Sequence, residues 1–163
     1  MSQNQLLADT ALKLGKPFIG VIYEPKHAND GMGVQFLQAW MDGNESGAGW
    51  MKGQPWCATF ASFLLWLSGN ALGIPVKLPK TASSSEFYSF AKANGLILPG
   101  PIVGCLALQK GDGGSPGKTH HHTCIVYAVN SLSPTFNSLD GNFGDKVGMN
   151  THVTADFDFV AVC

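Results

Sequence analysis

The pattern of apolar and polar residues divides the chain into a helical first half and a second half that favours strands. In the first half, apolar residues recur three and four positions apart, which places them on one face of a helix. Two of these stretches open with the spacing of a capping box, Ser2 before Gln5 and Ser83 before Glu86. We therefore expect helices over residues 2–15, 30–43, 57–69 and 83–95.

The helix that begins at Cys57 is the most apolar of the four. Its apolar positions follow an i, i+3, i+4, i+7 pattern with few polar interruptions, which predicts a central and deeply buried helix. A polar and glycine-rich stretch over residues 44–55 comes before it and is typical of a surface loop. This predicted loop directly precedes Trp56 and Cys57.

Short β-prone runs follow from residue 103 onward. Clusters of Gly, Pro, Asn, Ser and Asp separate them, as in strands joined by tight turns. Helices first and strands afterwards predict an α+β fold, with the N-terminal helices packed on a largely antiparallel sheet. No repeat or linker divides the chain, so we expect one domain over residues 1–163. The expected strands cover residues 103–109, 123–129, 135–140, 146–153 and 158–162.

Composition and charge narrow the classes of function. Of the 163 residues 13% are charged and the formal net charge is −1, a field too weak to favour nucleic acid or an anionic membrane. The N-terminus lacks the pattern of a secretory signal, and no apolar stretch is long enough to span a membrane. We expect cytoplasmic synthesis, a monomer without stable membrane association, and free thiols at Cys57, Cys105, Cys124 and Cys163.

The candidate chemistry begins with Cys57, in the first turn of the predicted central helix. Unpaired N–H groups and the helix dipole favour a negative charge there, and the thiolate is the nucleophilic form of cysteine. The alternative is a small buried core residue. A cysteine nucleophile needs at least a histidine that takes the thiol proton and a third polar group that orients this histidine.

Two later segments offer these partners. His120, His121 and His122 lead into a predicted strand, on which His120 and His122 share a face because strand side chains alternate. Asp140 or Asn142, at the end of the next strand, supplies the third polar group. Each signal is weak alone, because a histidine run is often a solvated turn and Asp-Gly-Asn is often a tight turn.

The order of these motifs resembles the papain-like peptidoglycan hydrolases of the CHAP and NlpC/P60 kind, above all the CHAP-type cell-wall hydrolases of phages and bacteria. GQPWCATFASFLLWLSG resembles their nucleophile segment, HTCIVYAV their histidine strand, and LDGNFGDKV the strand that follows. The resemblance covers about residues 30–162 and implies a papain-like fold with the nucleophile at the N-terminus of the central helix. Cys105 departs from the family pattern, as do Thr123 and Cys124.

Carried over residue by residue, the resemblance makes Cys57 the nucleophile and His122 the base. By the same match, Asp140 or Asn142 orients the imidazole. The reaction implied is hydrolysis of an amide in the peptide part of bacterial peptidoglycan, by an N-acetylmuramoyl-L-alanine amidase or an endopeptidase. A phage-type lysin, let out or delivered to the cell wall and requiring no cofactor, is the expected kind of protein.

Two residues beside the nucleophile have open roles. A second oxyanion donor is required besides the backbone N–H of Cys57, and Gln54 is a candidate for it. Its alternative role is that of a polar loop residue. Trp56 either lines the substrate groove or anchors the loop in the core.

The stretch DGNESG offers a candidate calcium loop. Asp42, Asn44 and Ser46 carry side-chain oxygens at alternate positions, as at the start of such a loop. The glutamate expected at the twelfth position is absent, because residue 53 is glycine. The alternative is an ordinary polar turn.

Three other functions compete with hydrolysis. A structural or binding module of a virus particle or secretion system would keep the fold without catalysis. A transition-metal site would use Cys57, His120 and His122 as ligands. A cysteine acyltransferase would share the nucleophile, base and orienting group but pass the acyl group to an amine.

Overall fold

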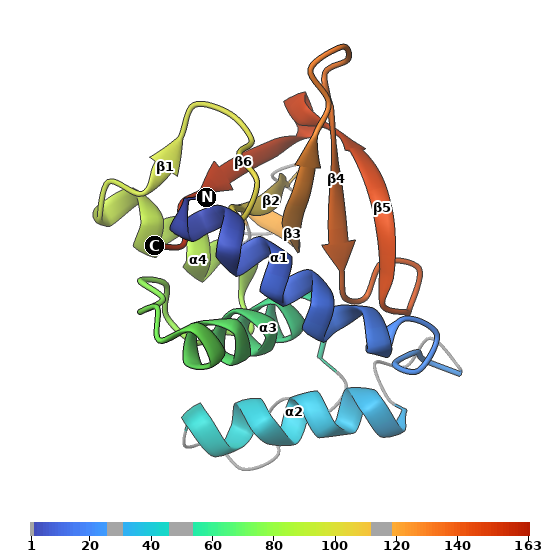
Figure 1. Cartoon of the computed structure of the whole chain (residues 1–163). Helices are drawn as coiled ribbons and strands as arrows, with labels where there is room; N and C mark the ends of the chain where they lie inside the picture. Colours follow the sequence, from blue (N-terminus) through green and yellow to red (C-terminus); the bar gives the residue numbers. More distant parts are fainter. Residues whose placement is uncertain (1, 26–30, 46–53, 112–118) are drawn as a thin grey trace.

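The structure is a computed structural model of the whole chain, and it describes residues 2–25, 31–45, 54–111 and 119–163 (Figure 1). The helices within these ranges are α1 (Gln3–Gly15), α2 (Met32–Glu45), α3 (Cys57–Leu72) and α4 (Ser84–Ala93), with 3-10 turns at Lys16–Phe18 and Thr154–Asp156. The strands are β1 (Ile97–Leu98), β2 (Leu106–Lys110), β3 (His120–Val129), β4 (Thr135–Asp140), β5 (Gly148–Val153) and β6 (Phe157–Val160).

The strands of the described residues form one sheet in the order β1-β6-β2-β3-β4-β5. Every neighbouring pair is antiparallel, which confirms the predicted α+β class and the antiparallel sheet. β3 is the longest strand and lies inside the sheet, with Ala107 of β2 opposite Cys124 on one side and Asp140 of β4 opposite it on the other. The end of β4 therefore lies beside the middle of β3.

Both predicted capping residues start their helices. The hydroxyl of Ser2 accepts a hydrogen bond from the N–H of Gln5, and that of Ser83 accepts one from the N–H of Glu86, each at 3.2 Å. These bonds satisfy N–H groups that have no partner inside the helix. At its other end α3 runs past the predicted stop at residue 69 to Gly73, whose φ of 65° suits glycine.

The predicted strands 103–109, 146–153 and 158–162 are β2, β5 and β6, with bounds shifted by up to three residues. Two further differences, at β3 and β1, come from strand pairing. β3 begins at His120 instead of Thr123, because Gln109 and Lys110 of β2 pair with His122 and His120 and draw them into the sheet. β1 was not expected at all. It has only two residues and is formed by pairing with β6, a partner far along the chain that no local pattern reveals.

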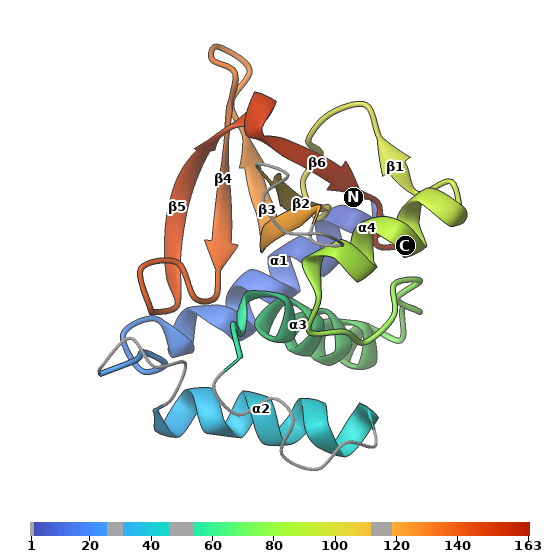
Figure 2. The same ribbon diagram turned by 180° about the vertical axis from the view of Figure 1, so that it is seen from behind.

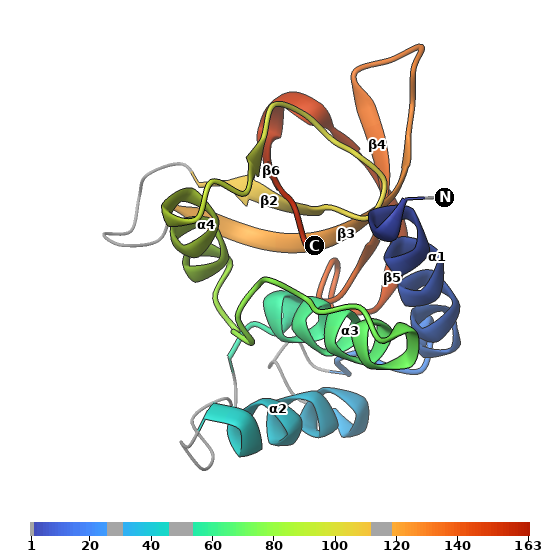
Figure 3. The same cartoon turned by 60° about the vertical axis from the view of Figure 1, so that its left-hand side comes forward.

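Helices α1, α3 and α4 pack against β3, and α2 packs against α3 on the side away from the sheet (Figures 1 and 3). The main apolar core lies between these helices and the sheet. Phe60 and Leu64 of α3 belong to it, together with Leu106 of β2 and Ile125 of β3. No helix in the described ranges combines the length and apolar character needed to cross a membrane.

A second apolar cluster covers the opposite face of the sheet. Its residues on β2 and β3, Ala107 and Cys124, alternate with those of the main core, and strand side chains alternate between faces. The sheet is strongly curved (Figure 2), and the ring of Phe136 lies 5.1 Å from Phe157 and 5.3 Å from Phe159. This cluster adjoins the polar residues described next.

Candidate active site

Cys57 is the first residue of α3 and exposes 5% of its surface. Trp56, the residue before it, makes no side-chain hydrogen bond that caps the helix. The N–H groups of the first turn therefore have no side-chain acceptor from this cap. Together with the positive end of the helix dipole they stabilise a negative charge at this position.

A network of buried contacts fixes the chain where it enters α3. The indole N–H of Trp56 donates to the carboxylate of Glu24 at 2.5 Å, and both side chains are buried. The backbone before Glu24 is tied to the turn after β4, because the N–H of Val147 donates to the carbonyl of Ile22 at 3.0 Å. The start of α3 is thus held against the end of β4.

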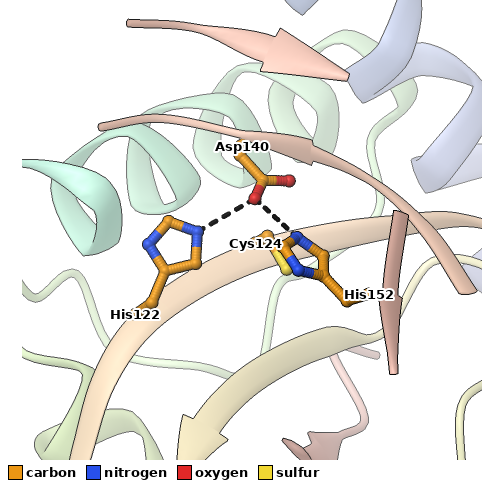
Figure 4. Close-up of side chains that lie close together, drawn as sticks. All are labelled: His122, Cys124, Asp140 and His152. Carbon is orange, nitrogen blue, oxygen red and sulfur yellow. Dashed lines mark hydrogen bonds and ion pairs between the residues drawn. The ribbon is translucent and has the colours of Figure 1, made fainter. Parts of the chain in front are cut away.

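His122 lies on β3 and is buried. Its Nε2 is 3.0 Å from Oδ2 of Asp140, and Figure 4 shows the other ring nitrogen turned away from that carboxylate. The thiol of Cys57 lies close enough to this imidazole for each to shift the pKa of the other, and its Sγ is 4.0 Å from the carbonyl oxygen of His121. Since Nε2 is engaged by Asp140, Nδ1 is the nitrogen left for the sulfur.

Asp140 ends β4 and has no exposed surface. Its Oδ2 also lies 2.8 Å from Nε2 of His152, and its Oδ1 accepts a hydrogen bond from the hydroxyl of Ser138. Burial alone would raise the pKa of this carboxyl, but the hydrogen bonds from His122 and His152 hold it below its ordinary range. Asp140 is therefore a buried carboxylate that fixes the ring of His122.

Cys57 and His122 shift each other's acidity in the directions that favour an ion pair. Burial alone would raise the pKa of the Cys57 thiol, but the hydrogen bond to His122 and its charge lower that pKa below the ordinary value. Burial alone would lower the pKa of His122, but hydrogen bonds to Asp140 and Cys57 raise it from 6.5 to about 9. A thiolate beside an imidazolium is an activated nucleophile.

The remaining predicted site residues lie as follows. Asp140 hydrogen-bonds His122, whereas Asn142 is half-buried in the turn after β4 and has a φ of 57°. Gln54 is exposed on the segment that leads into α3, and its oxyanion role stays a prediction. Trp56 exposes none of its surface, which fits an anchor in the core. It therefore does not line a substrate groove.

The proposed ligand set Cys57, His120 and His122 is not brought together as a metal site within the described residues. Nε2 of His120 binds Asp158 at 3.0 Å, and its ring stacks on Tyr88 at 4.3 Å between centroids. The group of ligand atoms that does converge is formed by His122, Cys124, Asp140 and His152. All four cysteines are free thiols, as expected.

Two residues of the candidate calcium loop lie at the end of α2. Asp42 and Asn44 belong to this helix, and Ser46 lies outside the described residues. A calcium loop and an ordinary polar turn are both non-helical, so residues 42–45, which are helical, match neither prediction.

His152 and Phe143 are site residues that the sequence analysis missed. The rings of Phe136, Phe143 and Phe157 lie 5.5, 5.2 and 4.9 Å from the ring of His152. Phe143 also lies 5.5 Å from His122 and is 41% exposed, so it is an apolar surface beside the imidazole. The sequence placed His152 in a predicted strand, but nothing in the sequence indicated that its ring contacts Asp140.

A separate cavity of about 190 Å³ lies beside the second half of α3. Trp66, Asn70 and Lys80 are among its lining residues. The ammonium group of Lys80 lies 5.1 Å from the ring centre of Trp66 and 5.5 Å from that of Trp40. None of the residues around Cys57 and His122 lines this cavity.

No protein-family model matches the chain, and no curated protein matches its sequence. Among solved structures, one described as "The crystal structure of Ly7917" is similar, with a TM-score of 0.42 and 21% identity. The match covers 64% of this chain and 52% of that one, so the chain spans about half the length of this neighbour.

Proposed function

We propose that this protein is a cysteine-dependent hydrolase that cleaves an amide bond in the peptide part of bacterial peptidoglycan. The observation that carries the catalytic part is the contact of the Cys57 thiol with His122, whose ring Asp140 holds. The substrate class rests on the resemblance of the nucleophile, histidine and following strands to CHAP-type hydrolases. A papain-like fold of that kind is part of the same proposal.

In the first half of the reaction, the thiolate of Cys57 attacks the carbonyl carbon of the amide. A C–S bond forms, and the negative charge moves to the carbonyl oxygen, where the backbone N–H of Cys57 donates to it. The imidazolium of His122 then gives its proton to the amide nitrogen. The C–N bond breaks, the amine leaves, and a thioester remains on Cys57.

In the second half, His122 is neutral and acts as a base. It takes a proton from water, which attacks the thioester and releases the acid, and Cys57 returns to the thiolate. Asp140 stays ionised throughout because it is hydrogen-bonded by His122, His152 and Ser138. Its task is to orient the imidazole and to stabilise the imidazolium.

The exposed face of Phe143 is a candidate contact for the substrate, since it adjoins His122 and is open to solvent. The chemistry serves either an N-acetylmuramoyl-L-alanine amidase or an endopeptidase, and both would release a new amino group. We propose a phage-type lysin as the biological role. The reaction uses side chains of this chain alone and requires no cofactor.

The test is digestion of purified peptidoglycan, with mass spectrometry of the products. We expect fragments from the wild type and from Cys105→Ala, a matched variant that removes another buried thiol. We expect none from Cys57→Ala, with its fold checked by circular dichroism. Equal release by Cys57→Ala would refute the nucleophile, and no release by the wild type would refute the substrate.

The same digest separates the competing functions. A new carboxyl on muramic acid identifies an amidase, and a new amino end within the stem or cross-bridge identifies an endopeptidase. An added small amine that becomes attached to the acyl fragment would identify an acyltransferase instead. A protein that binds the wall without cleaving it would be a binding module.

A further inference from the structure

We propose that His122, Cys124, Asp140 and His152 form a binding site for zinc, and that the bound ion stops His122 from acting as the acid and base of the reaction. The binding part stands on the geometry of these four side chains alone. The switching part rests on the proposed function. Together they describe a second state of the same group of residues.

The four side chains converge from three neighbouring strands (Figure 4). Their ligand atoms all lie within 4.8 Å of one another, and Oδ2 of Asp140 is 3.0 and 2.8 Å from the two histidine nitrogens. A tetrahedral zinc ion with bonds of about 2.0–2.3 Å keeps its ligand atoms roughly 3.3–3.8 Å apart. Shifts of less than about 1 Å per side chain would complete the site.

The donor atoms match zinc better than other common cations. Two imidazole nitrogens, one sulfur and one carboxylate oxygen suit zinc, whereas calcium and magnesium prefer oxygen ligands. A thiolate at Cys124 and the carboxylate of Asp140 would neutralise the two positive charges of the ion. This balance matters because both side chains have no exposed surface.

The sheet holds the ligands in place before any ion binds. His122 and Cys124 are two residues apart on β3 and so share a face, and Asp140 lies opposite Cys124 on β4. Three phenylalanine rings pack around His152 on β5. The thiol of Cys124 makes a long contact of 3.8 Å with the carbonyl of Ala107 and also interacts with the side chain of Ser138, and metal binding would replace both weak contacts.

A zinc ion at this site would take the His122 nitrogen that Asp140 holds in the metal-free protein. The ion needs the lone pair of Nε2, so the neutral ring would carry its one proton on Nδ1, the nitrogen left for Cys57. Such a ring is no longer an imidazolium that can protonate the leaving amine, and it has no free lone pair with which to take a proton from water. Binding would release the protons of the Cys124 thiol and of the coordinating nitrogens, and it should therefore tighten as the pH rises.

The binding test uses untagged Cys57→Ala protein, so that no metal can bind at the nucleophile. Zinc is titrated against a chromogenic chelator, and we expect one equivalent to bind. Cys124→Ser in this background should weaken binding at least about 100-fold, and the matched Cys105→Ala should leave it unchanged. Cobalt should give a thiolate charge-transfer absorption that Cys124→Ser abolishes.

His152→Gln keeps this test decisive if Cys124→Ser does not fold, and it should weaken binding at least about tenfold. Binding of less than half an equivalent of zinc to the Cys57→Ala protein would overturn the site. A zinc affinity that neither Cys124→Ser nor His152→Gln changes would also overturn it. The switch is tested on cleavage of purified peptidoglycan by the wild type. One equivalent of zinc should slow the release of fragments at least about tenfold, but not in Cys124→Ser.

An unchanged rate of cleavage by the zinc-loaded wild type would overturn the switch. The binding test uses no peptidoglycan. Zinc binding together with no cleavage of peptidoglycan by the metal-free wild type would refute the proposed function, and the switch that rests on it, but not the zinc site. Cleavage by a protein that binds no zinc would refute the zinc site alone.

Discussion

Cys57 at the start of α3 and Cys124 in the middle of β3 are both buried, yet their thiols differ in acidity. Burial raises the pKa of each. At Cys57 the hydrogen bond to His122 and its charge outweigh burial, and the pKa falls below the ordinary value. At Cys124 the negative charge of Asp140 adds to burial, and the pKa rises well above it.

The difference shows that burial alone does not decide whether a cysteine is reactive. Cys57 sits at the positive end of a helix and contacts a histidine, whereas Cys124 sits within a strand directly opposite a carboxylate. The sign of the neighbouring charge decides the ionisation of each sulfur. As a consequence, in the metal-free protein an activated thiol on α3 lies close to a thiol on β3 that stays protonated.

The largest effect should come from replacing the activated sulfur. Cys57→Ser keeps the shape of the side chain, but a hydroxyl is not ionised beside His122. We expect the rate of peptidoglycan hydrolysis to fall by about 10³-fold or more. Cys105→Ser is the matched control and should keep its rate within about threefold. A Cys57→Ser rate within tenfold of the wild type would remove the distinction between the thiols.

The next largest effect should come from removing the buried charge that holds His122. Asp140→Asn keeps the size of the side chain but no longer favours the imidazolium, so hydrolysis should fall by about 100-fold or more. The pKa of His122 should fall with it, which nuclear magnetic resonance of the imidazole can follow. A loss of stability with an unchanged pKa of His122 would show a purely structural role.

The pH dependence follows from the same ion pair in metal-free protein. His122 must be protonated to release the amine, and its pKa is raised to about 9 by Asp140 and Cys57 despite burial. Activity should therefore fall as the pH rises through about 9, by roughly tenfold per pH unit beyond it. It should also fall at low pH, where Cys57 is protonated. An alkaline decline already centred near 6.5 would contradict the raised pKa.

A smaller effect is expected at the second histidine on Asp140. His152→Gln retains a hydrogen-bond donor but loses the ring that packs against three phenylalanines, so Asp140 should hold His122 less firmly. We expect hydrolysis to fall by about three- to tenfold, mainly in kcat. A change in KM alone would instead point to contact with substrate, and the pH profile of His152→Gln would show whether Asp140 is affected.

The local elements of the fold were predictable from the sequence. Ser2 and Ser83 mark helix starts because capping depends on residues only three positions away. The start of β3 at His120 was not predictable from the sequence, because the pairing with β2 that places the histidines in the sheet is non-local. β1 was missed for the same reason.

The candidate site shows the same division. The motifs predicted Cys57 and His122, with either Asp140 or Asn142 as the third residue. Strand pairing separates them, because Asp140 lies in β4 opposite β3, whereas Asn142 lies in the turn that follows. His152 lies on β5, where only the order of strands in the sheet reveals that its ring reaches Asp140.

The most direct test is the pH dependence of alkylation at each cysteine, read by peptide mass spectrometry in metal-free buffer. Cys57 should react with iodoacetamide well below the ordinary thiol pKa of about 8.5, while native Cys105 and Cys124 stay unmodified. In His122→Gln the midpoint for Cys57 should rise to or above that value. If Cys57 in the wild type titrates near 8.5 and His122→Gln leaves its midpoint unchanged, the ion pair does not exist.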